Sequence, residues 1–183
     1  MRVSLVLLAV GLLGALVAWS PPSAVAAVPG AKIQAEGVSD QDRRYANAAH
    51  QNNQFEMTTG AMAETKGTCR RVRELGAEFA EHHLALDADL LAVTARQGIV
   101  LDAPPDPVLA AALTDLVARS GPDFDAAWLR DQIAVHQRAL ADGDQELRYG
   151  WSSDVKGEAL VMARVLTAHL GEAEAALAAC VAA

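Results

Sequence analysis

Four ionisable side chains have the types and spacing of a metal site: Glu56, His83, His136 and His169. Each falls near the middle of a long amphipathic segment, three or four residues from that segment's apolar positions, so that it faces the same way as they do. Neutral imidazoles and a carboxylate are ligands for zinc, copper or iron. The sequence therefore predicts a transition-metal site built from one side chain of each of four helices.

Helix geometry also puts these side chains at one level. His83 follows Cys69 by 14 residues and His169 precedes Cys180 by 11, which gives about 21 and 17 Å at a rise of 1.5 Å per residue. All four lie near helix midpoints, so their levels agree whichever way the helices run. The alternative is a buried cluster of hydrogen-bonded histidines without a metal, partnered by Glu56 or by polar neighbours such as Asn52, Gln132 or Asp87.

The remaining histidines are interpreted as surface residues. His82 is rotated by about 100° from His83 on the same helix and is expected in solvent, and His50 is expected there or at the periphery of the site. Glu172 and Asp87 lie one helical turn from His169 and His83, where they are either outer partners of those residues or solvated acids.

The elements that must position these residues are all helical. Aromatic residues make up only 4% of the chain, no sustained alternation of apolar and polar residues occurs, and apolar residues recur instead at intervals of three and four. Cap residues, glycines and prolines bound four long helices, at 39–66, 68–97, 123–149 and 154–180, and a short helix at 106–119. The predicted fold is an all-α four-helix bundle over residues 39–183.

The connection between the second and third long helices is long enough to cross the bundle from end to end. If it does, the start of the second helix and the end of the fourth lie together, and Cys69 can pair with Cys180. In a simple up-down order the two cysteines would lie about 40 Å apart. We expect the crossover and an intrachain disulfide; two buried thiols or a bridge between chains are the alternatives.

The first 27 residues have the pattern of a secretory signal peptide, with Arg2, an apolar run from Val3 to Trp19, and the cleavage pattern Ala24-Val25-Ala26. An uncleaved N-terminal membrane anchor is the alternative. Residues 28–38 read as an irregular leader. Cleavage would leave 14 lysines and arginines against 23 acids, a charge of about −9, which disfavours nucleic acid as a partner.

Four segments resemble a known family: "NQFEMTTGAMAETK", "FAEHHLALDADLLAVTARQGI", "DFDAAWLRDQIAVHQRAL" and "VLTAHLGEAEAAL". They are similar to exported bacterial proteins of the domain-of-unknown-function family numbered 4142. The resemblance implies a ferritin-like bundle with a long crossover, and it matches the family's motif residues at Glu56, His83, His136 and His169. The chain departs from the family pattern at His82, where an aspartate is usual, and at Trp128, where a tyrosine is common.

The resemblance brings no established activity, and no catalytic residues are predicted. The Glu-x-x-His pairs of di-iron enzymes, phosphate-binding glycine loops and zinc-protease motifs do not occur in the sequence. Two functions follow: a metal-binding protein of the cell envelope, or a structural or interaction domain of the envelope with an unknown protein partner. In the second, the histidines are simply buried.

Overall fold

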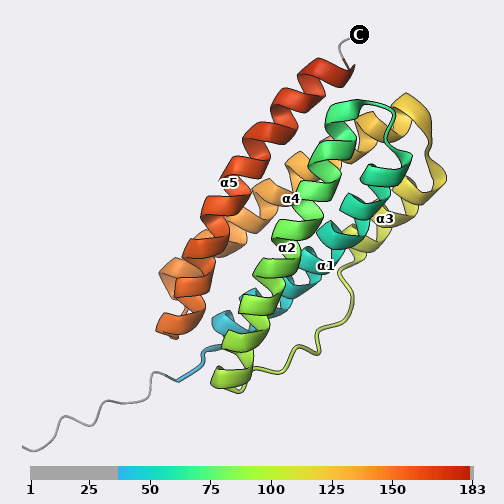
Figure 1. The fold of residues 1–183 in the computed structure, drawn as a ribbon. Helices are drawn as coiled ribbons and strands as arrows, with labels where there is room; N and C mark the ends of the chain where they lie inside the picture. The colour runs from blue at the N-terminus through green and yellow to red at the C-terminus, as the bar shows by residue number, and fades with distance from the viewer. Residues whose placement is uncertain (1–36, 182–183) are drawn as a thin grey trace, which may run out of the picture. The chain divides into compact units, whose positions relative to one another are not determined.

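The computed structural model describes residues 37–181, which form five helices and no strand. Four helices are long and one is short (Figure 1). In chain order they are α1 Asp40–Lys66, α2 Arg70–Gln97, α3 Pro107–Ala118, α4 Gly121–Tyr149 and α5 Ser153–Val181. The predicted all-α class is confirmed, and the predicted helix ends differ by at most two residues. The predicted signal peptide and most of the leader lie outside the described residues.

Local sequence signals set the helix boundaries. Ser39 and Asp42 form a capping box at the start of α1, in which each side chain binds the backbone N–H of the other residue. The carboxylate of Asp106 accepts from the first N–H groups of α3, and Pro107 follows at the first helical position. Gly98 ends α2 with a φ of 64°, a left-handed conformation that glycine adopts without steric cost.

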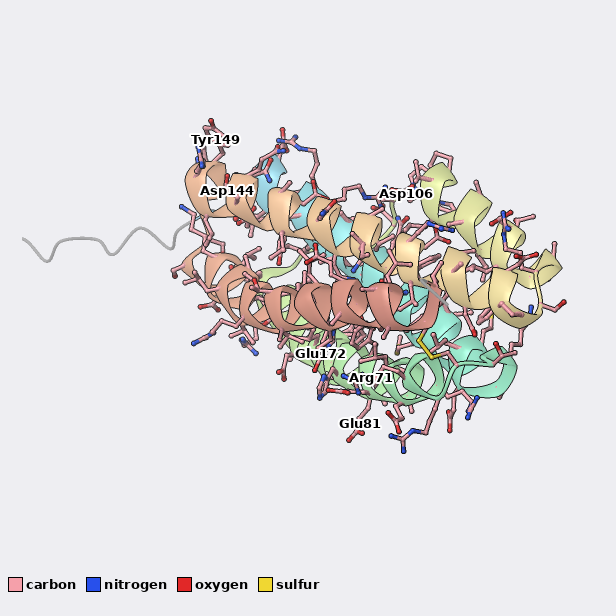
Figure 2. The ribbon with its side chains drawn as sticks, turned by 90° about the horizontal axis from the view of Figure 1, so that it is seen from above. Arg71, Glu81, Asp106, Asp144, Tyr149 and Glu172 are labelled. Atoms are coloured by element: carbon pink, nitrogen blue, oxygen red, sulfur yellow. A yellow bond between two sulfur atoms is a disulfide. The ribbon has the colours of Figure 1, made fainter. Side chains whose placement is uncertain are left out.

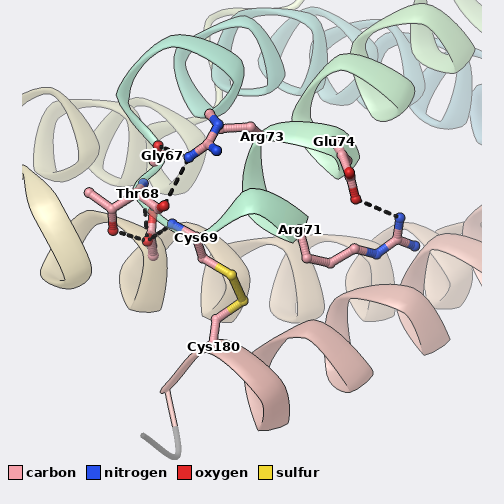
Figure 3. Close-up of a disulfide and its surroundings, with 8 residues drawn as sticks. Gly67, Thr68, Cys69, Arg71, Arg73, Glu74 and Cys180 are labelled. Carbon is pink, nitrogen blue, oxygen red and sulfur yellow. Dashed lines mark hydrogen bonds and ion pairs between the residues drawn. A yellow bond between two sulfur atoms is a disulfide. The ribbon is translucent and has the colours of Figure 1, made fainter.

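The starts of α2 and α4 lie together, so these two helices run in the same direction. Asp125, near the start of α4, is buried and accepts hydrogen bonds from the backbone N–H groups of Thr68 and Cys69 and from the Thr68 hydroxyl. The end of α5 reaches the same place, where a disulfide joins Cys69 to Cys180 (Figure 3). The segment between α2 and α4, which contains α3, therefore travels the length of the bundle.

At the opposite end of the bundle, Asp42 connects the start of α1 to the segment that precedes α5. Besides capping α1, its carboxylate accepts from the backbone N–H groups of Trp151 and Ser152, which precede α5. Burial alone would raise the pKa of Asp42, but these hydrogen bonds outweigh it and lower the pKa to about 2. Buried aspartates thus fasten both ends of the bundle, each by satisfying backbone N–H groups at a helix start.

Helices α1 and α2 approach each other closely at two glycines. A Cβ atom on Gly60 would lie 2.5 Å from the backbone oxygen of Gly76, and a Cβ atom on Gly76 would lie 2.6 Å from that of Gly60. Only glycine allows this separation of the two backbones. The close approach fixes the position of the C-terminal half of α1 along α2.

A buried polar layer separates two apolar clusters. One cluster surrounds Phe79 and Trp128, towards the disulfide, and the other surrounds Leu86 and Leu166, towards the far end. The layer between them consists of fully buried polar side chains: Asn53, Glu56, His83, Gln132, His136 and His169. None of the helices between residues 37 and 181 combines the length and apolar character needed to cross a membrane.

Candidate metal centre

Three imidazoles from three helices meet in the polar layer. His83 on α2, His136 on α4 and His169 on α5 are each at most 1% exposed, and one ring nitrogen of each lies within 4.8 Å of the others. We call these residues the three-histidine cluster. Each occupies an apolar position of its helix repeat, for example His83 between Phe79 and Leu86, so the burial of the neighbours carries the imidazole into the core.

His83 is oriented by an amide that fixes its tautomer. Its Nδ1 lies 2.9 Å from Oδ1 of Asn53, and Nδ2 of Asn53 is directed at Asp87, 3.4 Å away. The amide oxygen can only accept, so Nδ1 of His83 carries the proton and Nε2 carries the lone pair. That Nε2 atom is buried and has no hydrogen-bond partner, which is an unfavourable state for a polar atom in a core.

A backbone carbonyl group fixes the tautomer of His136 in the same way as Asn53 fixes that of His83. Its Nδ1 donates to the carbonyl oxygen of Gln132, 2.8 Å away on the preceding turn of α4. The lone pair is again on Nε2, which lies 3.2 Å from Nδ1 of His169. The imidazole of His136 therefore presents its free nitrogen to the cluster.

His169 has contacts at both of its ring nitrogens. Nδ1 faces His136, and Nε2 lies 2.9 Å from Nδ1 of His82. Because Nε2 of His136 is an acceptor, Nδ1 of His169 donates to it, and Nε2 of His169 accepts from His82. The His82 partner can reverse these roles, since an imidazole both donates and accepts; Nδ1 of His169 would then be free as a ligand.

Burial keeps the imidazoles uncharged. It lowers the pKa of His83 well below the ordinary value, and the neighbouring histidines add to the shift. Burial also lowers the pKa of His136 to about 4 and that of His169 to about 3. All three rings are neutral at pH 7, which is the form that binds metals.

The distances between the imidazole nitrogens of the cluster are close to those between the ligands of a metal site. In a tetrahedral site with bonds of about 2.0–2.1 Å, ligand nitrogens lie about 3.3 Å apart. The pair formed by His136 and His169 already has a separation of 3.2 Å, and all three nitrogens fall within 4.8 Å. A modest inward movement of His83 would complete a trigonal set of nitrogen donors with a fourth position open.

Glu56, the predicted fourth member, lies beside the cluster. Its Oε1 is 3.7 Å from Nδ1 of His136, on the side of that ring away from His169. Burial raises the pKa of Glu56 to about 8, with the Asp131 charge adding to the rise and the Gln132 amide opposing it. Glu56 is therefore mostly a neutral carboxylic acid at pH 7, and neither oxygen has a well-aligned hydrogen bond.

The predictions for the neighbouring residues had mixed outcomes. The prediction that His82 is exposed is confirmed; its direct contact with His169 was not predicted. His50 is half-buried and its Nδ1 lies 2.7 Å from Asp87. Asp87 is buried and reaches His83 through Asn53, and it is an outer partner rather than a solvated acid. Glu172 pairs instead with Arg71 across α5 and α2, at 3.5 Å.

Comparison with known proteins agrees with the resemblance inferred from the sequence. Residues 27–176 match the family described as Domain of unknown function (DUF4142). The fold is similar to that of a DUF305 fragment from Deinococcus radiodurans, known from a crystal structure, with a TM-score of 0.69 and 18% identity. That similarity covers 77% of this chain and 97% of the other, and at this identity it concerns the fold alone. No curated protein matches the sequence. Since the family match spans most of its length, this chain belongs to the DUF4142 family.

Proposed function

We propose that this protein is an exported, ferritin-like helical bundle that binds one transition-metal ion through His83, His136 and His169. The observation that carries the proposal is Nε2 of His83, a buried lone pair with no partner that lies beside two other neutral imidazoles. A metal ion would satisfy this atom. Three imidazoles with an open fourth position suit zinc or copper; iron centres of ferritin-like enzymes use more carboxylates than this layer offers.

Glu56 supplies the negative charge that a buried cation needs. Three neutral imidazoles leave the charge of a divalent ion uncompensated, and a positive charge across the buried His136 ring favours ionisation of the Glu56 carboxylic acid. Because the pKa of Glu56 is about 8 without metal, binding at pH 7 should release about one proton per ion. Calorimetry in buffers of different ionisation enthalpy measures this release, which Glu56→Gln should abolish.

The disulfide supports export and the crossover supports the ferritin-like arrangement. A bond between Cys69 and Cys180 persists in oxidising compartments and is rare in the cytosol, in agreement with the signal peptide predicted over residues 1–27. The parallel course of α2 and α4, joined by a connection as long as the bundle, is the topology expected of ferritin-like folds.

Metal content and affinity test the metal function. Protein purified without an affinity tag should bind one equivalent of Zn²⁺ or Cu²⁺ and melt at a higher temperature with the ion than without it. The double variant His83→Ala/His136→Ala should lose both properties, whereas Tyr149→Ala, which removes an exposed ring at the end of α4, should keep them. Equal metal content in wild type and double variant would exclude this site.

A structural or interaction domain of the cell envelope is the second candidate. The hydrogen bonds that link His82, His169 and His136 favour it, because they satisfy most of the imidazole nitrogens without a metal. In that case metals leave the melting temperature unchanged, and removal of a cluster histidine lowers stability and changes nothing else.

A further inference from the structure

One neighbouring side chain connects the buried three-histidine cluster to the surface. A cation cannot reach rings that are at most 1% exposed unless an adjacent residue admits it. Most of the side chains in contact with the cluster are themselves fully buried, including Asn53, Gln132 and Phe79. Among the contacts of the described residues, His82 is the exposed one, within hydrogen-bond distance of His169.

The contact between His82 and His169 connects the surface to the core. The two rings are nearly parallel and meet edge to edge, with an interplanar angle of 8°, a centroid separation of 5.1 Å and facing nitrogens 2.9 Å apart. The opposite nitrogen of His169 faces His136 in the cluster, 3.2 Å away. One imidazole, that of His169, therefore has one nitrogen towards the buried cluster and the other towards the exposed ring.

The hydrogen-bond directions leave a free ligand atom at the surface. Nδ1 of His82 donates to Nε2 of His169, because His169 donates its own proton to His136. In this tautomer Nε2 of His82 carries a lone pair, and no described residue binds it. An imidazole lone pair open to solvent is a ligand for transition-metal ions.

Carboxylates lie near this position on both helices, and Arg71 of α2 pairs with one of them, Glu172. Glu78 and Glu81 lie one turn before His82 and next to it on α2, and Glu172 lies one turn after His169 on α5. Figure 2 shows Glu81 and Glu172 on the side of the bundle where α2 and α5 run together. Three carboxylates against one arginine leave this part of the surface negative, which raises the local concentration of cations and their rate of arrival.

We propose that His82 and His169 form the access site of the cluster, where a divalent transition-metal ion is first bound from solvent. The ion exchanges bound water for an imidazole nitrogen of His82, and the His82 ring then moves away from His169 and admits the ion to the inner nitrogens. This inference rests on the proposed metal function, and it assigns His82 to the rate of loading rather than to the affinity of the loaded site.

Stopped-flow loading with Zn²⁺, followed by competition with a chromogenic chelator, separates rate from affinity. We expect His82→Gln to lower the association rate constant at least tenfold and the dissociation rate constant by a similar factor, with Kd changed less than threefold. Tyr149→Gln, which changes an exposed ring at the end of α4, is the control and should load at the wild-type rate. His82→Ala serves as a second variant, and circular dichroism verifies that each protein is folded.

The outcomes separate this inference from the proposed function. An unchanged or faster association rate in both His82 variants, with wild-type protein binding one ion, overturns the access site and leaves the metal function intact. An unchanged association rate with faster dissociation makes His82 a determinant of affinity and also overturns it. Absence of zinc binding in the wild type overturns both the metal function and the access site.

Discussion

Replacing Glu56 by glutamine should change how stability depends on pH. The folded protein holds the Glu56 proton up to about pH 8, whereas the unfolded chain releases it near the ordinary value of 4.5. The carboxyl group therefore favours the folded state fully below pH 4.5, and this contribution is lost as the pH rises towards 8. Glutamine has nearly the same shape and does not titrate, so Glu56→Gln removes this pH dependence.

The rise in the pKa of Glu56 on folding sets how much stability is lost with increasing pH. The loss amounts to about 1.4 kcal/mol per pH unit between the two pKa values, or about 5 kcal/mol in total once the pH is above 8. Such a loss is comparable with the whole stability of many domains, about 5–15 kcal/mol. Without metal, the stability of the wild-type protein should therefore fall much more between pH 5 and pH 8 than the stability of Glu56→Gln does.

Urea unfolding of both proteins from pH 5 to pH 8, in the presence of a chelator, measures the difference directly. The free energy of unfolding of wild type minus that of Glu56→Gln should fall by about 4 kcal/mol over this range. Other titrating groups, including the histidines, are shared by both proteins and cancel to a good approximation. Parallel pH profiles would show that Glu56 ionises as in water, and would refute its assignment as a buried neutral acid.

Three further predictions concern the frame that holds the cluster. Gly76→Ala should destabilise the protein by about 1–3 kcal/mol through a backbone clash, whereas Gly157→Ala, with nothing within 4 Å of its Cβ, should stabilise it by up to about 1 kcal/mol; equal effects in thermal unfolding would contradict the close helix approach. Asp125→Ala should cost about 2 kcal/mol by leaving N–H groups at the start of α2 without partners, and a neutral result in urea would exclude that role. Reducing the bond between Cys69 and Cys180 should lower stability by about 4–5 kcal/mol, because it closes a loop of 111 residues; an unchanged melting temperature with dithiothreitol would count against it.

The helix ends and the inward histidines could be predicted because both depend on local sequence. Ser39, Pro107 and Gly98 act within one turn of their own helix, and the helical repeat alone turns His136 inward. Contacts between helices also depend on how each helix is rotated about its axis. Leu160 lies at an apolar spacing in its helix, yet it is 52% exposed, because α5 turns other residues to the core: Val155, Ala159, Met162 and Leu166.

The dependence on helix rotation also explains which contacts around the site the sequence did not predict. The pairing of His82 with His169 requires α5 to lie beside α2 at a given height and rotation, and nothing in either helix alone specifies that. The position of Glu56 on the far side of His136 depends in the same way on the rotation of α1. The apolar repeat does not predict the role of Asp125, because that role depends on the start of α2 lying next to it.

Anomalous diffraction at the zinc absorption edge, from crystals of the untagged protein loaded with Zn²⁺, tests the central claim most directly. A single peak should lie within about 2.0–2.1 Å of three nitrogens, Nε2 of His83, Nε2 of His136 and Nδ1 of His169. Peaks confined to surface residues, with Nε2 of His83 still without a partner, would contradict the claim and leave the cluster as a hydrogen-bonded part of the core.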